Sequence, residues 1–481
     1  MLGPPKSRHL DRPVFISLEA YVPKDHFYRH HEHTLDLAFV RDLAADRYAS
    51  GGRPSIYPVV FFKLHLIMFF EGLRSERKLI EIADLNLAHR WYLGYNLDEP
   101  LPDHSSLSKI RTRLALPVFR RFFDVIVEQC VQAGLVWGKE LIFDATKVHA
   151  NASMDSLAPV LRRIVDDHLA ALAETAAEMP EETARWELLE ECRLDPDRPP
   201  TSYYERKSDQ RVSTTDPDAA LMKPRSGRAC LGYHDHYVVD GGKARIILHA
   251  FVTPADVMEN QPMLDQLRRV MFRWRVRPQR IIADTTYGTI ENIRALEGEE
   301  GIRAYVPLPD WEHKTAYYGP AQFRYDAERD IYLCPQSLPL RPYRRELKAE
   351  KVEYRADAAI CNACPRKAEC TPSEQGRSVH RSFHAEYLDR VRGYHETEAY
   401  AKAMRKRKVW IEPLFGEAKQ WHGMRQFRLR GLQKVNIEGL FIAAGQNLKR
   451  LLSVKGWGRR PWPDGAAGFA SVGVKTCFTP T

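Results

Sequence analysis

The sequence predicts an α/β fold, in which a mixed sheet flanked by helices follows an N-terminal all-α domain. Three observations lead to this prediction. Residues 140–150 resemble a buried strand, because an apolar run with β-branched residues surrounds a single acid. Residues 233–252 resemble a β-hairpin, because two apolar stretches flank the turn residues Asp240-Gly241-Gly242. Residues 405–451 carry apolar side chains at helical spacing.

Residues 14–139 form the predicted helical domain. Residues 58–70 are apolar nearly all round, so we expect a buried helix there. Ser75 is the expected cap of a second helix, and Pro117 is expected to begin another. The basic residues after Asp103 are typical of a helix-turn-helix module that binds DNA. They are equally typical of a helical bundle with a solvated basic face.

Residues 140–455 form the predicted α/β domain, and two insertions interrupt it. We expect residues 151–229 to form an insertion or long connection that begins with a charged helical segment. We expect residues 309–390 to form an irregular insertion that contains a cluster of cysteines. A further helix is expected from about residue 260 to 272, and residues 456–481 are expected to form a disordered tail.

The composition indicates a protein that works with an anionic partner. The chain has 481 residues, of which 44% are hydrophobic, so it can bury large cores. Its 72 Lys and Arg exceed its 63 Asp and Glu, which gives a net charge of +9. Nucleic acid is the leading candidate for such a partner. The sequence shows neither a signal peptide nor an apolar run of membrane-spanning length, so we expect a cytoplasmic protein.

Three acids lie on or at the end of predicted elements. Asp144 lies in the strand 140–150, Asp284 ends a short apolar strand, and Glu412 lies on the helical segment. Pro413 predicts a kink or a helix start at Glu412. Glu417 is turned by about 140° from Glu412 on a helix, so it cannot share that face.

This order of strands, hairpin and helices is that of a ribonuclease H-like fold. Asp144, Asp284 and Glu412 would then meet and hold two divalent cations about 3.5 to 4 Å apart. Carboxylates are suitable ligands for Mg²⁺ or Mn²⁺. Such a site indicates phosphoryl transfer on a nucleic acid.

Several motifs extend this interpretation. They are Arg90-Trp91-Tyr92-Leu93-Gly94, Pro102-Asp103-His104-Ser105-Ser106-Leu107-Ser108, Asp144-Ala145-Thr146, Thr215-Asp216-Pro217-Asp218-Ala219, Ala283-Asp284-Thr285-Thr286-Tyr287-Gly288, Glu412-Pro413-Leu414-Phe415-Gly416 with Lys419, and Arg430-Gly431-Leu432. In these motifs the chain resembles the DDE transposases of bacterial insertion sequences. The resemblance is to insertion-sequence families four and five, most closely to the eleven-eighty-two group, and extends from about Tyr57 to Leu452.

The resemblance implies a transposase that cleaves DNA at the terminal inverted repeats of its own element and joins the freed 3′ ends to target DNA. Such a protein would act in the bacterial cytoplasm, at the nucleoid. Asp144, Asp284 and Glu412 match the metal-binding triad of the family, and Glu412 with Lys419 matches its Glu-x6-Lys spacing. Arg405 and Lys408 stand where the family has Tyr and Arg, so the chain departs from the family pattern there.

The basic residues around Glu412 are candidate contacts to DNA phosphates. They are Arg405, Lys408, Lys419, Arg425, Arg428 and Arg430. A solvated basic loop is the alternative for the last three. Two element ends must meet before they are joined, so we expect a homodimer on double-stranded DNA. Two other functions remain open at this stage: a catalytically silent DNA-binding protein derived from a transposase, and a stand-alone metal-dependent nuclease.

Four cysteines in the second insertion form a candidate zinc site. Cys361 and Cys364 have the x2 spacing of a zinc knuckle, and Cys370 and Cys334 are the other candidate ligands. His380 or His384 is an alternative ligand. A redox pair and unliganded cysteines are the competing interpretations.

Overall fold

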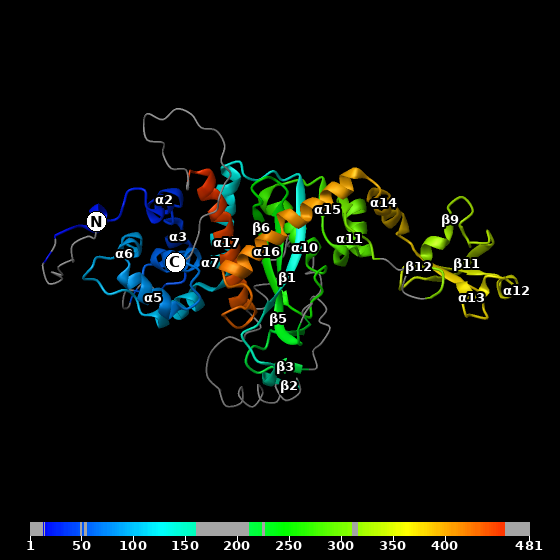
Figure 1. Cartoon of the computed structure of the whole chain (residues 1–481), viewed down its shortest axis with the longest axis horizontal. Coiled ribbons are helices and arrows are strands. Elements are labelled where there is room, and N and C mark those ends of the chain that lie inside the picture. The colour runs from blue at the N-terminus through cyan, green and yellow to red at the C-terminus, as the bar shows by residue number, and fades with distance from the viewer. Residues whose placement is uncertain are drawn as a thin grey trace, which may run out of the picture.

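The computed structural model describes residues 13, 15–48, 51, 55–159, 211–223, 227–309 and 316–456. Along its long axis a group of helices is followed by a central mixed sheet and then by a smaller sheet (Figure 1). Within the described ranges, no helix combines the length and the apolar character needed to cross a membrane. The predicted tail lies outside these ranges except for Gly456, and so does most of the predicted charged helix that begins at Leu157.

Only helices precede the first strand in the described part of the chain. They are α1 (Leu18–Tyr21), α2 (Phe27–Thr34), α3 (Phe39–Ala45), α4 (Pro58–Phe70), α5 (Glu76–Leu85), α6 (Leu87–Leu93) and α7 (His104–Gln132). The Ser75 hydroxyl accepts the Lys78 N–H at 3.3 Å, which confirms the predicted cap of α5. Ala115, with φ of 56°, interrupts α7 just before Leu116-Pro117. The prediction of a new helical segment at Pro117 is therefore also confirmed.

The central sheet contains antiparallel and parallel pairs. Its strands are β1 (Glu140–His149), β4 (Ala220–Met222), β5 (Cys230–Asp240), β6 (Ile247–Pro254), β7 (Arg280–Ile282) and β8 (Arg303–Tyr305). They follow the order β4-β5-β1-β7-β8, and β6 also pairs with β5. β5 and β6 are antiparallel, which confirms the predicted hairpin. β1 pairs in parallel with β7, and β7 pairs in parallel with β8.

The segments between these strands differ in part from the prediction. α10 (Met263–Trp274) agrees with the expected helix, and α11 (Ile290–Arg294) connects β7 to β8. β2 (Leu157–Pro159) pairs with β3 (Arg211–Ser213), so the prediction of a helix is wrong at its first three residues. The apolar residues of Leu157–Pro159 therefore belong to a short strand pair and not to the apolar face of a helix.

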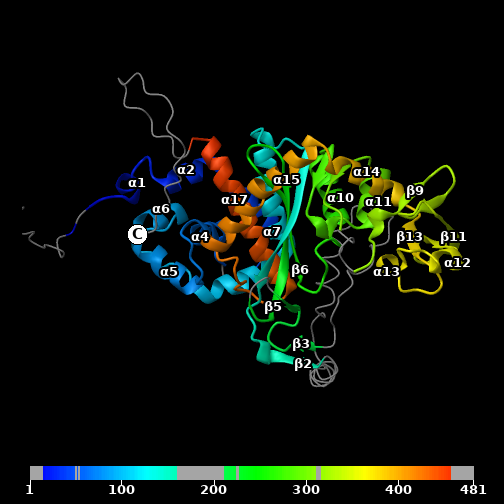
Figure 2. The same cartoon turned by 45° about the vertical axis from the view of Figure 1, so that its right-hand side comes forward.

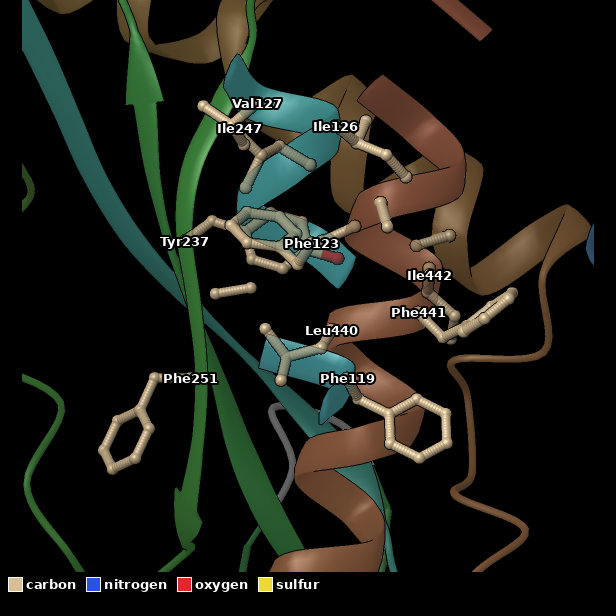
Figure 3. Packing of buried hydrophobic residues seen from close by; sticks show 14 of the residues in the cluster. Phe119, Phe123, Ile126, Val127, Tyr237, Ile247, Phe251, Leu440, Phe441 and Ile442 are labelled. Atoms are coloured by element: carbon tan, nitrogen blue, oxygen red, sulfur yellow. The ribbon is translucent and has the colours of Figure 1, made fainter. Parts of the chain in front are cut away.

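One hydrophobic core joins the N-terminal helices to the sheet. In it α7 packs against α17 (Leu432–Val454), and both lie beside β6 (Figure 2). Phe123 and Ile126 of α7 and Leu440 of α17 lie on the same side of the sheet, whereas Phe251 points to the other side (Figure 3). The helical segment and the α/β segment therefore pack as one body around shared side chains.

Two buried asparagines of α17 complete the outer edge of β6. Asn447 exchanges two hydrogen bonds of 2.8 Å with the backbone of Ile247. Asn436 does the same with Val252 at 2.9 Å. An edge strand leaves backbone groups unpaired, and a buried unpaired group is costly. These side chains therefore fix α17 to the sheet in one register.

The second insertion contains regular structure, so the prediction of an irregular region over residues 309–390 is wrong. An antiparallel sheet is built from β9 (Arg324–Asp326), β10 (Ile331–Leu333), β11 (Pro339–Glu346), β12 (Lys351–Ala356) and β13 (Ser378–Ser382). It is accompanied by α12 (Ala358–Asn362) and α13 (Lys367–Cys370). These strands are short and rich in arginine, and most of β11 is exposed. They therefore lack the apolar alternation that identifies a strand in the sequence.

The chain returns to the central sheet through a helical arm. It comprises α14 (Ala385–His395), α15 (Glu398–Trp410) and α16 (Glu412–Trp421). α15 packs beside β7 and β8. α16 begins at Glu412, with Pro413 in its first turn, which confirms the predicted helix start.

Candidate active site

Two of the three predicted acids are carried by adjacent parallel strands. Ile142 of β1 is in register with Ile282 of β7, and Asp144 and Asp284 each follow two residues later. Asp284 lies just beyond β7, where its Oδ1 accepts the Thr286 N–H at 2.9 Å and caps a short 3₁₀ helix. The register of one strand pair thus brings the two carboxylates to the same end of the sheet.

Arg407 joins the two carboxylates. Its Nη2 donates to Oδ2 of Asp144 at 3.0 Å and to Oδ2 of Asp284 at 3.4 Å. Arg407 lies on α15, one helical turn before the buried Ile411. The sequence predicts Arg405 and Lys408 as contacts on this helix and gives no role to Arg407. The spacing of Arg407 from Ala403 and Ile411, which share the buried face, is the signal that identifies it.

Burial controls the charge of Asp144. It raises the pKa of this carboxyl to about 6, against the opposing effect of Arg407, and Asp284 raises it further. Asp144 is 8% exposed, so its carboxylate has little access to water. Asp144 therefore takes up a proton more readily than an exposed aspartate, and the charge of Arg407 beside it favours the ionised form.

A third acid, Glu259, lies near this pair and was not predicted. It follows β6, and its Oε1 lies 3.6 Å from Nε2 of His234. Burial, followed by the charges of Asp284 and Asp144, raises the pKa of Glu259 to about 7. The only sequence signal was an acid just after a buried strand, which is common in turns. Tyr287 is buried beside the same acids, and burial raises its pKa well above the usual value.

Glu412 lies at the first position of α16 and is exposed. Phe415, one turn later, stacks on Tyr237 with ring centroids 4.6 Å apart, and Tyr237 is the β5 partner of Asp144. No contact between Glu412 and either aspartate occurs within the described residues. In the same ranges, no three His, Cys, Asp or Glu side chains are arranged to hold a metal ion. The structure therefore brings Asp144 and Asp284 together and leaves Glu412 on the adjoining helix.

Glu417, the second acid on α16, forms contacts within the fold. Its carboxylate binds Lys449 and lies 3.5 Å from Nη2 of Arg450. Burial favours a higher pKa for Glu417, but His422, whose Nε2 lies 3.7 Å from its Oε1, and the two cations hold it well below the usual range. These groups fix α16 to α17.

The predicted DNA contacts differ in their availability. Arg405, Lys408 and Arg425 are exposed. Lys419 is half-buried, and burial followed by the charge of Arg425 lowers its pKa. Two further predicted contacts are already engaged: Arg428 pairs with Glu76 at 2.8 Å, and Arg430 donates to the Asn151 carbonyl at 2.9 Å.

All four cysteines of the candidate zinc site line one pocket beside the small sheet. They are Cys334, Cys361, Cys364 and Cys370, and all are free thiols. The two alternative ligands lie elsewhere. His380 is exposed on β13, and Nε2 of His384 lies 3.4 Å from a carboxylate oxygen of Glu350.

Two protein-family models match parts of the sequence. One, described as a transposase domain (DUF772), matches residues 16–113. The other, described as a transposase DDE domain, matches residues 333–452. Glu412 and the four cysteines lie inside the second match, whereas Asp144 and Asp284 lie outside both. A comparison with curated proteins finds no match.

Proposed function

Because the two matched domains indicate a transposase, we propose that this chain cleaves DNA at the terminal inverted repeats of its element and joins the 3′ ends to target DNA. The observation that carries the proposal is the proximity of Asp144 on β1 and Asp284 just after its parallel neighbour β7, where Arg407 contacts both carboxylates. We also propose that the element belongs to insertion-sequence families four and five, in or near the eleven-eighty-two group, on the strength of the motif resemblance.

The strand order supports a ribonuclease H-like core for this reaction. An antiparallel run of β6, β5 and β1 continues into the parallel strands β7 and β8. In such a core the first acid lies on the central strand and the second on its parallel neighbour. The location of Asp144 on β1 and of Asp284 just after β7 supports this assignment.

The donor set fits a hard divalent cation such as Mg²⁺ or Mn²⁺. Asp144 and Asp284 present carboxylate oxygens to a single cationic group, the Arg407 guanidinium, and carboxylate oxygens are the ligands that these ions prefer. When bound there, two such ions would supply activation of the attacking oxygen and stabilisation of the leaving oxygen of the scissile phosphodiester.

The residues of the chain would divide the remaining work. Asp144 and Asp284 would hold the cations, with Glu412 completing the site from the start of α16. Arg407 would release the two carboxylates as the cations bind and would then be free to contact the DNA phosphate. Arg405, Lys408, Lys419 and Arg425 would position the DNA backbone beside the carboxylates.

The test is cleavage and joining of DNA that carries the element's end sequences, in Mg²⁺. We expect Asp144→Asn, Asp284→Asn and Glu412→Gln each to lower cleavage by at least about 100-fold while leaving DNA binding within a few-fold. Glu396→Gln, an exposed acid at the end of α14, is the matched control and should cleave normally. Full cleavage by the Asp284 variant would refute the site.

The same assay separates the competing functions. Cleavage without joining indicates a stand-alone nuclease, and binding without cleavage indicates a catalytically silent protein. If Glu412→Gln cleaves normally while Glu259→Gln does not, the third ligand is Glu259, whose pKa is raised by burial and by the charges of both aspartates.

A further inference from the structure

The small five-stranded sheet has too little core to be stable on hydrophobic burial alone. Its buried apolar residues are Phe323, Tyr332, Leu340, Tyr354 and Val379. Modules of this size usually need disulfides or a metal ion in addition to their core. Its four cysteines are free thiols, so disulfides do not supply this stabilisation.

The four cysteines come from three adjacent turns of this module. Cys334 begins the turn between β10 and β11, where its N–H donates to the Leu338 carbonyl at 3.0 Å. Cys361 lies in α12, and the Cys364 N–H donates to the Cys361 carbonyl at 3.3 Å. Cys370 ends α13. The Ser337 N–H donates to the Cys334 carbonyl at 2.7 Å, so the first turn and the Cys-x2-Cys turn are closed by backbone hydrogen bonds of the same spacing.

The surroundings of the thiols suit thiolate ligands. The four thiols line one pocket, and Arg377, which lines the same pocket, donates from Nη1 to the Cys370 carbonyl at 3.0 Å. The backbone N–H of Arg377 donates to Sγ of Cys361 at 3.4 Å. Gly376 has φ of +87°, and a Cβ there would lie 2.8 Å from the Ala356 carbonyl oxygen. Glycine therefore permits the chain to pass close to the end of β12, beside Cys361.

Charge provides an independent argument. A zinc ion bound by four thiolates carries a net charge of about −2. Arg366, Lys367 and Arg377 line the same pocket as the four cysteines and would balance this charge. A redox pair would not require the two remaining cysteines or three cations around it.

We propose that Cys334, Cys361, Cys364 and Cys370 bind one structural Zn²⁺ that ties α12 and α13 to the turn between β10 and β11. The thiols are not gathered at ligand distance in the structure, since no group of three among the described residues meets that requirement. The ion would draw them together from their places around the pocket, because metal binding and the ordering of such a module are coupled. The site is independent of the catalytic carboxylates.

The experiment is metal analysis of the full-length protein purified without added metal. We expect close to one zinc per chain in the wild type, almost none in the Cys361→Ser/Cys364→Ser variant, and an unchanged content in Cys230→Ser. Cys230 lies at the start of β5, outside this module, so its variant is the matched control. A wild type without zinc, or a double variant with an unchanged zinc content, would overturn the proposal.

A measurement on the wild type covers the case in which the double variant fails to fold. The zinc is exchanged for Co²⁺, which shows intense thiolate-to-metal absorption when it is bound by four cysteines. We expect this absorption at one Co²⁺ per chain and its loss on adding one equivalent of Zn²⁺. Cobalt absorption typical of oxygen or nitrogen ligands alone would refute the four-cysteine site.

Discussion

The buried environment of Asp144 suits its proposed chemical role but lowers the stability of the folded protein. Its pKa of about 6 exceeds the value of an unfolded chain, so the folded state binds the proton more tightly. Folding therefore loses stability as the pH rises from about 4 to about 6, and the whole penalty remains above that range. We predict that Asp144→Asn stabilises the metal-free protein by on the order of 1 to 2 kcal/mol at pH 8. Denaturant unfolding in EDTA should show this gain at pH 8 and its disappearance near pH 4.

Arg407 should compete with divalent cations for the two aspartates. It bridges Asp144 and Asp284, and its removal leaves two adjacent carboxylates without a partner. We predict that Arg407→Ala lowers the melting temperature in EDTA and that Mg²⁺ raises it by more than in the wild type. Arg405→Ala, an exposed neighbour on the same helix, should respond to Mg²⁺ as the wild type does. An equal Mg²⁺ response in the wild type and Arg407→Ala would exclude this competition.

Residues of the candidate site could be predicted from the sequence when they lay on or next to a regular helix or strand. Asp144 and Asp284 stood out because an acid is rare on a buried strand, and the strand register does bring them together. Arg407 could not be singled out in the sequence, because Arg405 and Lys408 beside it are also basic. Only the direction in which each side chain leaves the helix distinguishes the three residues. Glu259 could not be predicted from the sequence, because its loop comes near the two aspartates only when β5, β6 and β7 have assembled into the sheet.

α16 is held by a buried electrostatic contact, which makes its position sensitive to pH. The pKa of Glu417 is held well below its usual range, so this residue contributes stability above the unfolded pKa of about 4.3 and loses it as the pH falls further. We predict that Glu417→Gln costs about 2 to 3 kcal/mol at pH 7, because Lys449 and Arg450 lose their partner. The difference from the wild type, measured by urea unfolding, should shrink below pH 4.

Elements with apolar periodicity were predictable, whereas the small sheet was not. The hairpin of β5 and β6, α10 and the start of α16 follow from patterns that the core imposes. The small sheet is stabilised instead by contacts such as Arg381 over Tyr325 at 3.9 Å and Arg355 over Tyr343 at 3.8 Å. Such pairs leave no period of two in the sequence, so residues 309–390 looked irregular.

Within the described residues, a large core lies next to several exposed cations, among them Arg405, Lys408 and Arg425. The core joins the N-terminal helices, the sheet and α17, so the residues of the two family matches lie partly in one packed body. Joining two element ends requires both to be held at once. We therefore predict that the complex with paired ends contains more than one protomer, which light scattering on the purified complex would measure. A monomer that holds both ends would contradict this prediction.

DNA affinity should depend on the exposed cations and not on those engaged within the fold. The net charge of +9 favours phosphate binding, and removing one cation that binds a phosphate reduces the dependence of log K on log salt concentration by about one. We predict this reduction for Arg405→Ala, Lys408→Ala and Arg425→Ala, each without a change in melting temperature. Arg428→Ala should instead lower the melting temperature, because Arg428 balances the charge of Glu76, and should leave the salt dependence unchanged. Fluorescence anisotropy between low and moderate salt would distinguish the two classes, and a salt dependence that none of the exposed variants alters would show that the DNA lies on another face.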